Sequence, residues 1–412
     1  MRKHSSRVGL ILIAAIVAAL AVIAPTATAR PETAKATTVR IWSDADRFAA
    51  VSKVAKAWGA ARGVDVQVVQ KQFGNLRTDL ATVQAETAPD VLVAANDWTG
   101  ELAANGLVVP IVPRAALKKQ FPKYTLDAFS YGRLYGAPVA TENIGLVVNT
   151  RLAKVPKTFA QLEKEALAFK RKSPDNLAIA VTQNAGTGDP YHMFPFFSGL
   201  CGYVFGKSKN GALNKNNLGI AAPKFLKNAS LIDKWNREGL VSSKIGYDNA
   251  KNAFLKGNAA FWITGPWEAD TLKKSGLSYR IIQMPKIKCR SVPFVGEQGF
   301  MVTKYANTHG VASLAKDLVS NYMMTASVQR EFYAVNGRPP ANRVAARGVS
   351  DPVLAQFNKA GVGAVPLPNI PQMASVWSEW GNAWVKATKG AGATPARAAF
   401  VTAARNIKAK IG

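Results

Sequence analysis

The stretch TVRIWSDADRFAAVSKVAKAWGAARGVDVQVVQ, residues 38–70, sets the fold class. It opens with a short β-branched and aromatic run at 38–42, continues with a helical pattern at 47–62 that stops at a glycine, and returns to a β-branched run at 66–70. A third apolar run follows at 91–95. Strands that alternate with helices in this way are typical of a parallel sheet with crossover helices. The sequence therefore predicts an α/β protein.

The rest of the chain continues this alternation and is long enough for more than one hydrophobic core. At 412 residues, 48% of them hydrophobic, the chain is expected to fold into two lobes. Further strands are expected at 136–139, 144–148, 177–182, 259–263, 279–284 and 299–303, and further helices at 159–172, at 223–238 and from near 265.

Residues 1–29 have the features of a secretory signal peptide. Basic residues precede an uninterrupted apolar run at 8–24, and ATA at 27–29 fits the small-x-small cleavage pattern. Cleavage would leave a chain that starts with a short flexible leader at 30–37. Because the apolar run is at the short edge of what spans a bilayer, an uncleaved anchor is the alternative.

No cysteine follows the run, so we do not expect a lipidated N-terminal thiol. The protein is expected to be exported, and to be periplasmic or extracellular and associated with the cell envelope.

The charge balance is strongly basic. The 53 Lys and Arg residues against 25 Asp and Glu residues give a formal charge of +28, and loss of the three basic residues before the apolar run would leave +25. The basic runs are scattered and lack the interleaved aromatics of a single-strand groove, so we expect no nucleic-acid partner. We interpret the charge as adaptation to an anionic cell envelope. With three His and two Cys residues, a structural zinc or iron–sulfur site is excluded, and no metal or cofactor is expected.

Six segments of the chain form a distinctive series. They are IW at 41–42 with Asp46, PDVL at 89–92, GAPV at 136–139 with Glu142, AFLKGNAAFWITGPW at 253–267, PFVG at 293–296 and PNIPQMASVW at 368–377. Together they resemble the extracellular solute-binding proteins of ABC importers, most nearly the maltose/maltodextrin-binding proteins. The resemblance runs in the same order from about residue 38 to the C-terminus, and the GPW and PNIPQM sequences are its most specific parts.

The resemblance implies a two-lobe, periplasmic-binding-protein-like clamp whose chain crosses between the lobes at a hinge. One lobe would hold residues 38–140 and 296–341. The other would hold residues 145–291 and 349–412. A single compact α/β enzyme domain with the same alternation is the alternative.

The resemblance also implies a sugar site. Carboxylates accept hydrogen bonds from neighbouring sugar hydroxyls, and flat rings bury the apolar C–H face of a pyranose. Without the resemblance, Asp46 and Asp97 would be interpreted as helix caps and the tryptophans as core residues. The residues at the family's sugar-contact positions are Asp46, Arg47, Asp97, Trp98, Glu142, Asp189, Tyr191, Trp267 and Trp377.

Five positions depart from the maltose-binding pattern. Ala94 stands in place of a stacking tryptophan, Trp98 and Gly381 stand in place of arginines, Trp380 is additional, and Phe48 lies where the family has a small or polar residue. The shape of the sugar subsites is therefore expected to differ. A cyclic or branched glucan, trehalose or another oligosaccharide remains open as the ligand.

The expected function is extracytoplasmic binding of a neutral, maltodextrin-like oligosaccharide and its delivery, by a monomeric protein, to the permease subunits of an ABC importer. The alternative is a secreted glycoside hydrolase that acts on a glucan, since hydrolysis needs two carboxylates about one bond. The sequence contains neither G-x-S-x-G nor a glycine-rich P-loop. We therefore expect no catalytic activity.

The two cysteines, Cys201 and Cys289, both fall in the second expected lobe. Disulfides form and persist in exported proteins. We therefore expect a bridge between them, and two buried thiols are the alternative.

Overall fold

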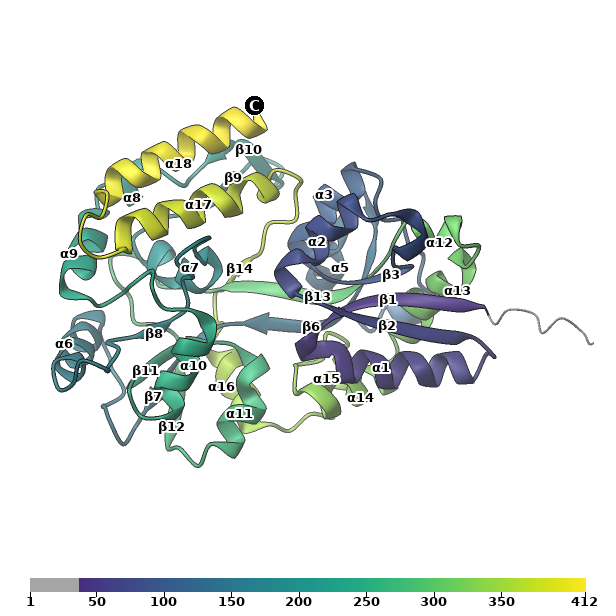
Figure 1. Cartoon of the computed structure of the whole chain (residues 1–412), viewed down its shortest axis with the longest axis horizontal. Coiled ribbons are helices and arrows are strands. Elements are labelled where there is room, and N and C mark those ends of the chain that lie inside the picture. The colour runs from purple at the N-terminus through teal and green to yellow at the C-terminus, as the bar shows by residue number, and fades with distance from the viewer. Residues whose placement is uncertain (1–36) are drawn as a thin grey trace, which may run out of the picture. The chain divides into compact units, whose positions relative to one another are not determined.

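Two larger β-sheets organise residues 37–412, the part of the chain that this computed structural model describes (Figure 1). The expected signal peptide at 1–29, its alternative as an anchor, and residues 30–36 of the expected leader lie outside the described residues. Within 37–412, no helix is both long and apolar enough to cross a membrane.

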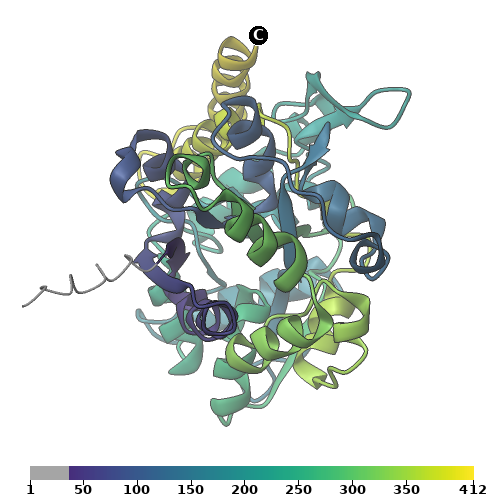
Figure 2. The ribbon, with the colours of Figure 1, turned by 90° about the vertical axis from the view of Figure 1, so that its right-hand side faces the viewer.

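The first sheet begins with the strand–helix–strand unit that the sequence predicts. β1 (Thr38–Asp44) pairs in parallel with β2 (Asp65–Lys71) and with β3 (Val91–Ala95). Between β1 and β2, α1 (Ala45–Ala60) carries buried alanine, valine and tryptophan side chains at a spacing of four residues, so one face of the helix packs inward. Figure 2 views this side, with α1 in purple beside the green helices of the last third of the chain.

Two long antiparallel strands connect this sheet with the second one. β13 (Phe294–Val302) lies beside β3, and β6 (Gly136–Asn143) pairs with the other edge of β13. One residue after β6 ends, β7 (Gly145–Asn149) begins in the second sheet. At its start β13 pairs with β14 (Val365–Pro366). The chain therefore passes between the sheets along β6 and β13, as Figure 1 shows.

The second sheet has the order β12-β7-β11-β8. Its other strands are β12 (Tyr279–Ile282), β11 (Phe261–Thr264) and the short β8 (Ala180–Val181). Helices cover it and enclose a large core rich in phenylalanine and tryptophan. Those that matter for the site or the core are α6 (Phe159–Lys170), α7 (Pro190–Gly199), α10 (Tyr247–Leu255), α17 (Met373–Thr388) and α18 (Ala396–Ile411).

Shorter elements complete the two lobes, as we call the two sheets with their helices. In the first half they are α2 (Phe73–Thr82), η1 (Ala85–Thr87), η2 (Asn96–Trp98), α3 (Thr99–Ala104), α4 (Ala115–Lys118), α5 (Lys123–Ala128), β4 (Ser130–Tyr131) and β5 (Arg133–Leu134). In the second half they are β9 (Phe205–Lys207), β10 (Leu213–Leu218), α8 (Pro223–Leu226), α9 (Ser230–Glu238), η3 (Pro266–Glu268), α11 (Ala269–Lys274), α12 (Tyr305–Thr308), α13 (Ala312–Asp317), η4 (Leu318–Tyr322), α14 (Ala326–Asn336), α15 (Arg343–Ala346) and α16 (Pro352–Ala360).

The single helix expected at 223–238 is wrong, because the chain forms α8 and α9 with a turn between them. In that turn the Asn228 side-chain amide donates to the carbonyl oxygens of Lys224, at 2.9 Å, and Leu200, at 3.2 Å. Asparagine side chains compete in this way with the helical hydrogen-bond ladder.

A disulfide joins Cys201 and Cys289, 88 residues apart in the chain. Cys201 lies just after α7, in a left-handed backbone conformation with φ of 70°. Cys289 lies between β12 and β13. The bridge therefore ties the end of α7 to the segment that leads into β13.

Candidate functional site

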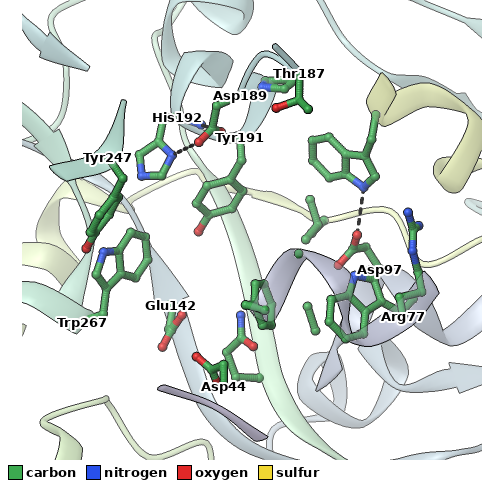
Figure 3. Close-up of a pocket in the computed structure, with 18 of the residues that line it drawn as sticks. Asp44, Arg77, Asp97, Glu142, Thr187, Asp189, Tyr191, His192, Tyr247 and Trp267 are labelled. Carbon is green, nitrogen blue, oxygen red and sulfur yellow. Dashed lines mark hydrogen bonds and ion pairs between the residues drawn. The ribbon is translucent and has the colours of Figure 1, made fainter. Parts of the chain in front are cut away.

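A cavity of about 550 Å³ lies between the two lobes and takes side chains from both (Figure 3). It is lined by acids, arginines and aromatic rings together. All nine residues that the sequence places in a sugar site line it, namely Asp46, Arg47, Asp97, Trp98, Glu142, Asp189, Tyr191, Trp267 and Trp377.

Strand ends and the first turns of helices supply these side chains. On the first lobe, the end of β1 leads into Asp44 and Asp46, and the end of β3 leads into Asp97. The carboxyl ends of parallel strands lie at one edge of a sheet, where open α/β folds bind ligands. On the second lobe, the start of α7 presents Tyr191 and the fifth residue of α17 is Trp377.

Asp97 and Trp377 join the two walls of the cavity. The Trp377 indole Nε1 donates to the Asp97 carboxylate at 2.8 Å, as the dashed line in Figure 3 shows. Burial raises the pKa of Asp97 to about 6, although the bond from Trp377 and the charge of Arg77 act in the opposite direction. The carboxyl is therefore mainly ionised at pH 7 and gains a proton at mildly acidic pH.

Glu142 is held by an arginine that the sequence analysis did not identify. The Arg338 guanidinium donates to Glu142 and lies 3.5 Å from an Asp46 carboxylate oxygen. It also lies over the Trp267 ring, 5.9 Å from the centroid. Burial alone would lower the pKa of Arg338, but the neighbouring carboxylates outweigh it and raise that pKa. Glu142, Arg338 and Trp267 therefore form one contact group that spans both walls.

Asp44 is a second residue that the sequence analysis missed. Arg47 Nε lies 2.6 Å from Asp44 Oδ1, and the same guanidinium donates to the side chain of Gln298 and lies over the Phe73 ring at 4.7 Å. The Asp46 side chain, by contrast, is 65% exposed. Both acids line the cavity, but Asp44 is the one that fixes Arg47.

The second lobe lines the cavity mainly with aromatic rings. Tyr191 and Trp267 lie 6.3 Å apart, and Trp377 stacks on Trp380 at 6.0 Å. Burial and the Glu142 charge raise the pKa of Tyr191, so its hydroxyl keeps its proton. Trp380 is fully buried in the second-lobe core, where Trp384 also lies. Of the α17 tryptophans, Trp377 therefore faces the cavity and the other two stabilise the lobe.

Asp189 is the predicted site residue that acts as a helix cap. Its carboxylate accepts from the backbone N–H of His192 at 3.0 Å and contacts the His192 ring Nδ1 at 2.7 Å. Capping is also the alternative that the sequence offers for Asp46 and Asp97, but no side-chain cap hydrogen bond occurs at the start of α1 or of η2. Asp97 accepts from Trp377 and Asp46 lies beside Arg338.

The structure shows where three of the residues that depart from the maltose-binding pattern lie. Ala94 is fully buried in β3, whereas Trp98 lines the cavity and packs on Phe73 at 5.0 Å between ring centroids. Gly381 lies against the loop before α7, and a Cβ on it would come within 2.1 Å of the Thr187 carbonyl oxygen. The loop backbone thus occupies the space in which a side chain at 381 would start.

Tyr247 completes the second-lobe wall, and Glu268 lies behind it. The Tyr247 hydroxyl donates to Glu268, which also lies 2.9 Å from the Lys251 ammonium. Burial and the Glu268 charge raise the pKa of Tyr247. No group of three or more metal-ligating side chains occurs within residues 37–412.

The chain is similar over most of its length to sugar-binding proteins. Residues 53–358 match the family described as bacterial extracellular solute-binding protein. The galactooligosaccharide-binding protein of Bacillus subtilis (strain 168) is 26% identical over 97% of this chain and 96% of its own. The maltodextrin-binding protein MdxE of that organism is 31% identical over 76% of each chain.

A solved structure extends the likeness to three dimensions. Thermus thermophilus maltotriose binding protein bound with maltotriose matches with a TM-score of 0.78 and 26% identity, covering 91% of this chain and 100% of that chain. The expected two-lobe α/β fold is thereby confirmed.

Proposed function

This chain belongs to the bacterial extracellular solute-binding proteins, and on that premise we propose that it binds a neutral oligosaccharide of the maltodextrin type between its lobes. The observation that carries the proposal is that two walls of different chemistry line one cavity. Carboxylates line the first-lobe side, and the rings of Tyr191, Trp267 and Trp377 line the second. Hydroxyl edges suit the first wall and the apolar face of a pyranose suits the second.

The acids retain acceptor capacity for sugar hydroxyls. An ionised carboxylate offers about four lone-pair sites. The Asp97 contact with Trp377 involves one of its oxygens, and the Glu142 contact with Arg338 likewise involves one. Each carboxylate can therefore hold its protein partner and accept from a ligand hydroxyl at the same time.

The charges of the lining favour a neutral ligand over an anionic one. All three arginines already lie against carboxylates, Arg47 against Asp44, Arg338 against Glu142 and Arg77 against Glu101. The acids also outnumber the arginines among the lining residues. An anionic sugar would therefore meet a wall whose cations are already paired. The named ligands of the relatives, galactooligosaccharide, maltodextrin and maltotriose, are all oligosaccharides.

We infer that ligand release and capture use the strands that connect the lobes. In this proposal residues 38–140 with 296–341 form one lobe, and residues 145–291 with 349–412 form the other. The crossing from β6 to β7 then serves as a hinge. The proposed partner is the permease of an ABC sugar importer, served by a monomeric, exported protein at the anionic cell envelope.

A glycoside hydrolase is the second candidate, and one observation favours it. Asp97 has a pKa raised to about 6, as a general acid in glycoside hydrolysis would require. Our proposal is that Asp97 binds without catalysis, because its contact is the Trp377 indole and because members of this family are solute-binding proteins. Incubation with maltodextrin should generate no new reducing ends. Their appearance at a rate proportional to protein concentration would establish the hydrolase.

The test of binding is a thermal-shift and calorimetric screen of linear, branched and cyclic glucans, trehalose and galactooligosaccharides. A ligand at 100 times its dissociation constant should add about 2.7 kcal/mol of stability. The control is a variant with Trp267→Ala and Trp377→Ala, which lacks both rings and should show no shift for the best ligand. If no saccharide stabilises the wild-type protein, or if the variant responds equally, the proposed site is wrong.

A further inference from the structure

One face of the first lobe, distant in sequence from most of the cavity lining, gathers basic side chains without acids. We call it the basic face. It is built from α4 and the loop before it, from the exposed side of α14, and from α15 with the residues that follow. Its members are exposed, and they are Arg114, Lys118, Lys119, Arg330, Arg343 and Arg347.

Hydrogen bonds bring these segments together. The Arg343 backbone N–H donates to the carbonyl of Gln120 at 2.9 Å, and its guanidinium donates to the carbonyl of Lys119 at 2.6 Å. The start of α15 therefore lies directly on the end of α4. Arg330 reaches the same region, because a Cβ on Gly348 would lie 3.5 Å from its side chain.

The positive charge of the basic face is not neutralised by neighbouring acids. Residues 107–122 and 337–350 contain no Asp or Glu. The acids that flank these segments have other partners: Asp127 pairs with Lys123 at 2.6 Å, Glu331 with Lys53 at 3.2 Å and Asp351 with Lys273 at 3.1 Å. Within residues 37–412, the side chains of the basic face form no ion pair, and Arg343 is the one that forms a hydrogen bond.

Two exposed apolar side chains accompany these charges. Val112, two residues before Arg114, is 82% exposed, and Val344, next to Arg343, is 45% exposed. Each belongs to one of the two segments that meet at Gln120. A soluble polyanion would gain only from the charges, whereas a lipid surface offers both anionic headgroups and an apolar layer for the valines.

We infer that the basic face docks on an anionic lipid bilayer. Lysine and arginine side chains near such a surface attract its headgroups over a distance comparable to the Debye length. None of the six residues lines the cavity, so docking leaves sugar binding free. The inference is independent of the identity of the sugar.

The test measures partitioning of the expected exported chain, which starts at Arg30, onto phosphatidylglycerol/phosphatidylcholine vesicles by co-sedimentation. Replacing Lys118, Lys119 and Arg347 by alanine should weaken partitioning about a hundred-fold at low salt. The matched control replaces Lys207, Lys209 and Lys256, which are exposed on the second lobe, by alanine and so removes the same charge. Its partitioning should weaken less than ten-fold. Equal losses in both variants would mean that net charge acts alone, which would overturn the inference. Absence of wild-type binding would overturn it too.

A second variant separates a bilayer from a polyanion. Val112→Ser with Val344→Ser keeps every charge and should weaken vesicle binding several-fold while leaving binding to soluble polyglycerol phosphate unchanged. Vesicle binding that is unaffected by the valine changes, with tight binding of the polymer, would assign the basic face to an anionic polymer and refute a lipid surface. All variants should keep wild-type melting temperatures and sugar affinity, since the substituted side chains are exposed and lie outside the cavity.

Discussion

The two walls of the cavity are built from different chemistry. The first-lobe wall consists of paired charges, in which Arg47 fixes Asp44 and Arg338 fixes Glu142. The second-lobe wall consists of rings backed by an aromatic core, in which Trp377 rests on Trp380. Charged hydrogen bonds select by geometry, because an unmatched buried acceptor is costly, whereas rings supply contact area with less directional demand. We therefore expect specificity to reside mainly in the first lobe and affinity mainly in the second.

Removing the disulfide should have the largest effect, and it should act on the second-lobe wall. The bridge ties the end of α7, whose start carries Tyr191, across an 88-residue separation. With Cys201→Ser and Cys289→Ser, the chain-entropy description gives a loss of about 4.5 kcal/mol. Denaturant unfolding with and without reductant would measure it. A double variant as stable as the oxidised wild type would mean that the bridge does not constrain the unfolded chain.

Breaking the ion pair between Arg338 and Glu142 should destabilise the first-lobe wall. Arg338→Ala leaves Glu142, which is 2% exposed, without its guanidinium and should cost about 4 kcal/mol of unfolding free energy. The double variant Arg338→Ala with Glu142→Ala should cost clearly less, because no unpaired charge remains. Urea unfolding of the single and double variants provides the comparison. Additive losses would show that the two side chains act separately.

The protonation of Asp97 should contribute to the pH dependence of the unfolding free energy. Its pKa is raised from 3.8 to about 6 in the folded protein, so between these values the folded state binds more protons than the unfolded state. The stability that this group contributes is therefore present below pH 3.8 and is lost as the pH rises through 6, by about 3 kcal/mol in all. Unfolding measured at pH 4, 5.5 and 7 should show this fall as a loss of stability of the wild type relative to Asp97→Asn, because buried Glu297, whose pKa is also raised, is common to both proteins. Identical profiles would place the titration elsewhere.

Sugar binding should have the opposite dependence on pH if the ionised Asp97 accepts from a ligand hydroxyl. Affinity should then fall about tenfold per pH unit below 6. Calorimetric titration of the best saccharide at pH 5 and 7 tests this. An affinity that is unchanged at pH 5 would remove the Asp97 carboxylate from ligand contact.

The smallest expected effect is that of Trp377→Phe on binding, and its comparison with Trp377→Ala separates the ring from the hydrogen bond where the two walls meet. Trp377→Ala should weaken binding by about 2 kcal/mol or more. It should also lower stability by about 1–3 kcal/mol, since buried Asp97 loses its donor. Trp377→Phe keeps a flat ring and loses only the N–H, so it should bind within about 1 kcal/mol of wild type while sharing the stability loss. Equal binding losses in both variants would show that the N–H, and not the ring, carries the affinity.

The fold class and the site positions could be predicted because they depend on local patterns and on the resemblance. The family likeness is confirmed, and the positions it implied converge on one cavity. Arg338 could not be found in the same way. It reaches Glu142 because the segment after it pairs with β6, where the Thr141 N–H donates to the Pro339 carbonyl at 3.1 Å. The sequence around Arg338 indicates only a chain break, and a contact over 196 residues leaves no local signal.

The role of Asp189 shows the same limit. The pattern Asp-Pro at 189–190 is typical of a helix start, and Asp189 does cap α7 while also lining the cavity. Capping and binding are therefore not exclusive alternatives for one side chain. The break between α8 and α9 was missed because Asn228 bonds to Leu200 in another segment, a contact that helical periodicity does not encode.

The contact between Gly381 and the loop before α7 restricts how this protein can change by mutation. A Cβ at 381 would lie 2.1 Å from the Thr187 oxygen, and a Cβ at Gly188 would lie 2.2 Å from the Gly381 oxygen. The close approach of the two backbones therefore makes a side chain at either position unfavourable. An arginine at 381, the residue that the resemblance to the maltose-binding proteins implies for this position, becomes possible only after the loop has been shortened or displaced. The order of substitutions, and not only their identity, thus limits which ligand specificities are accessible from this sequence.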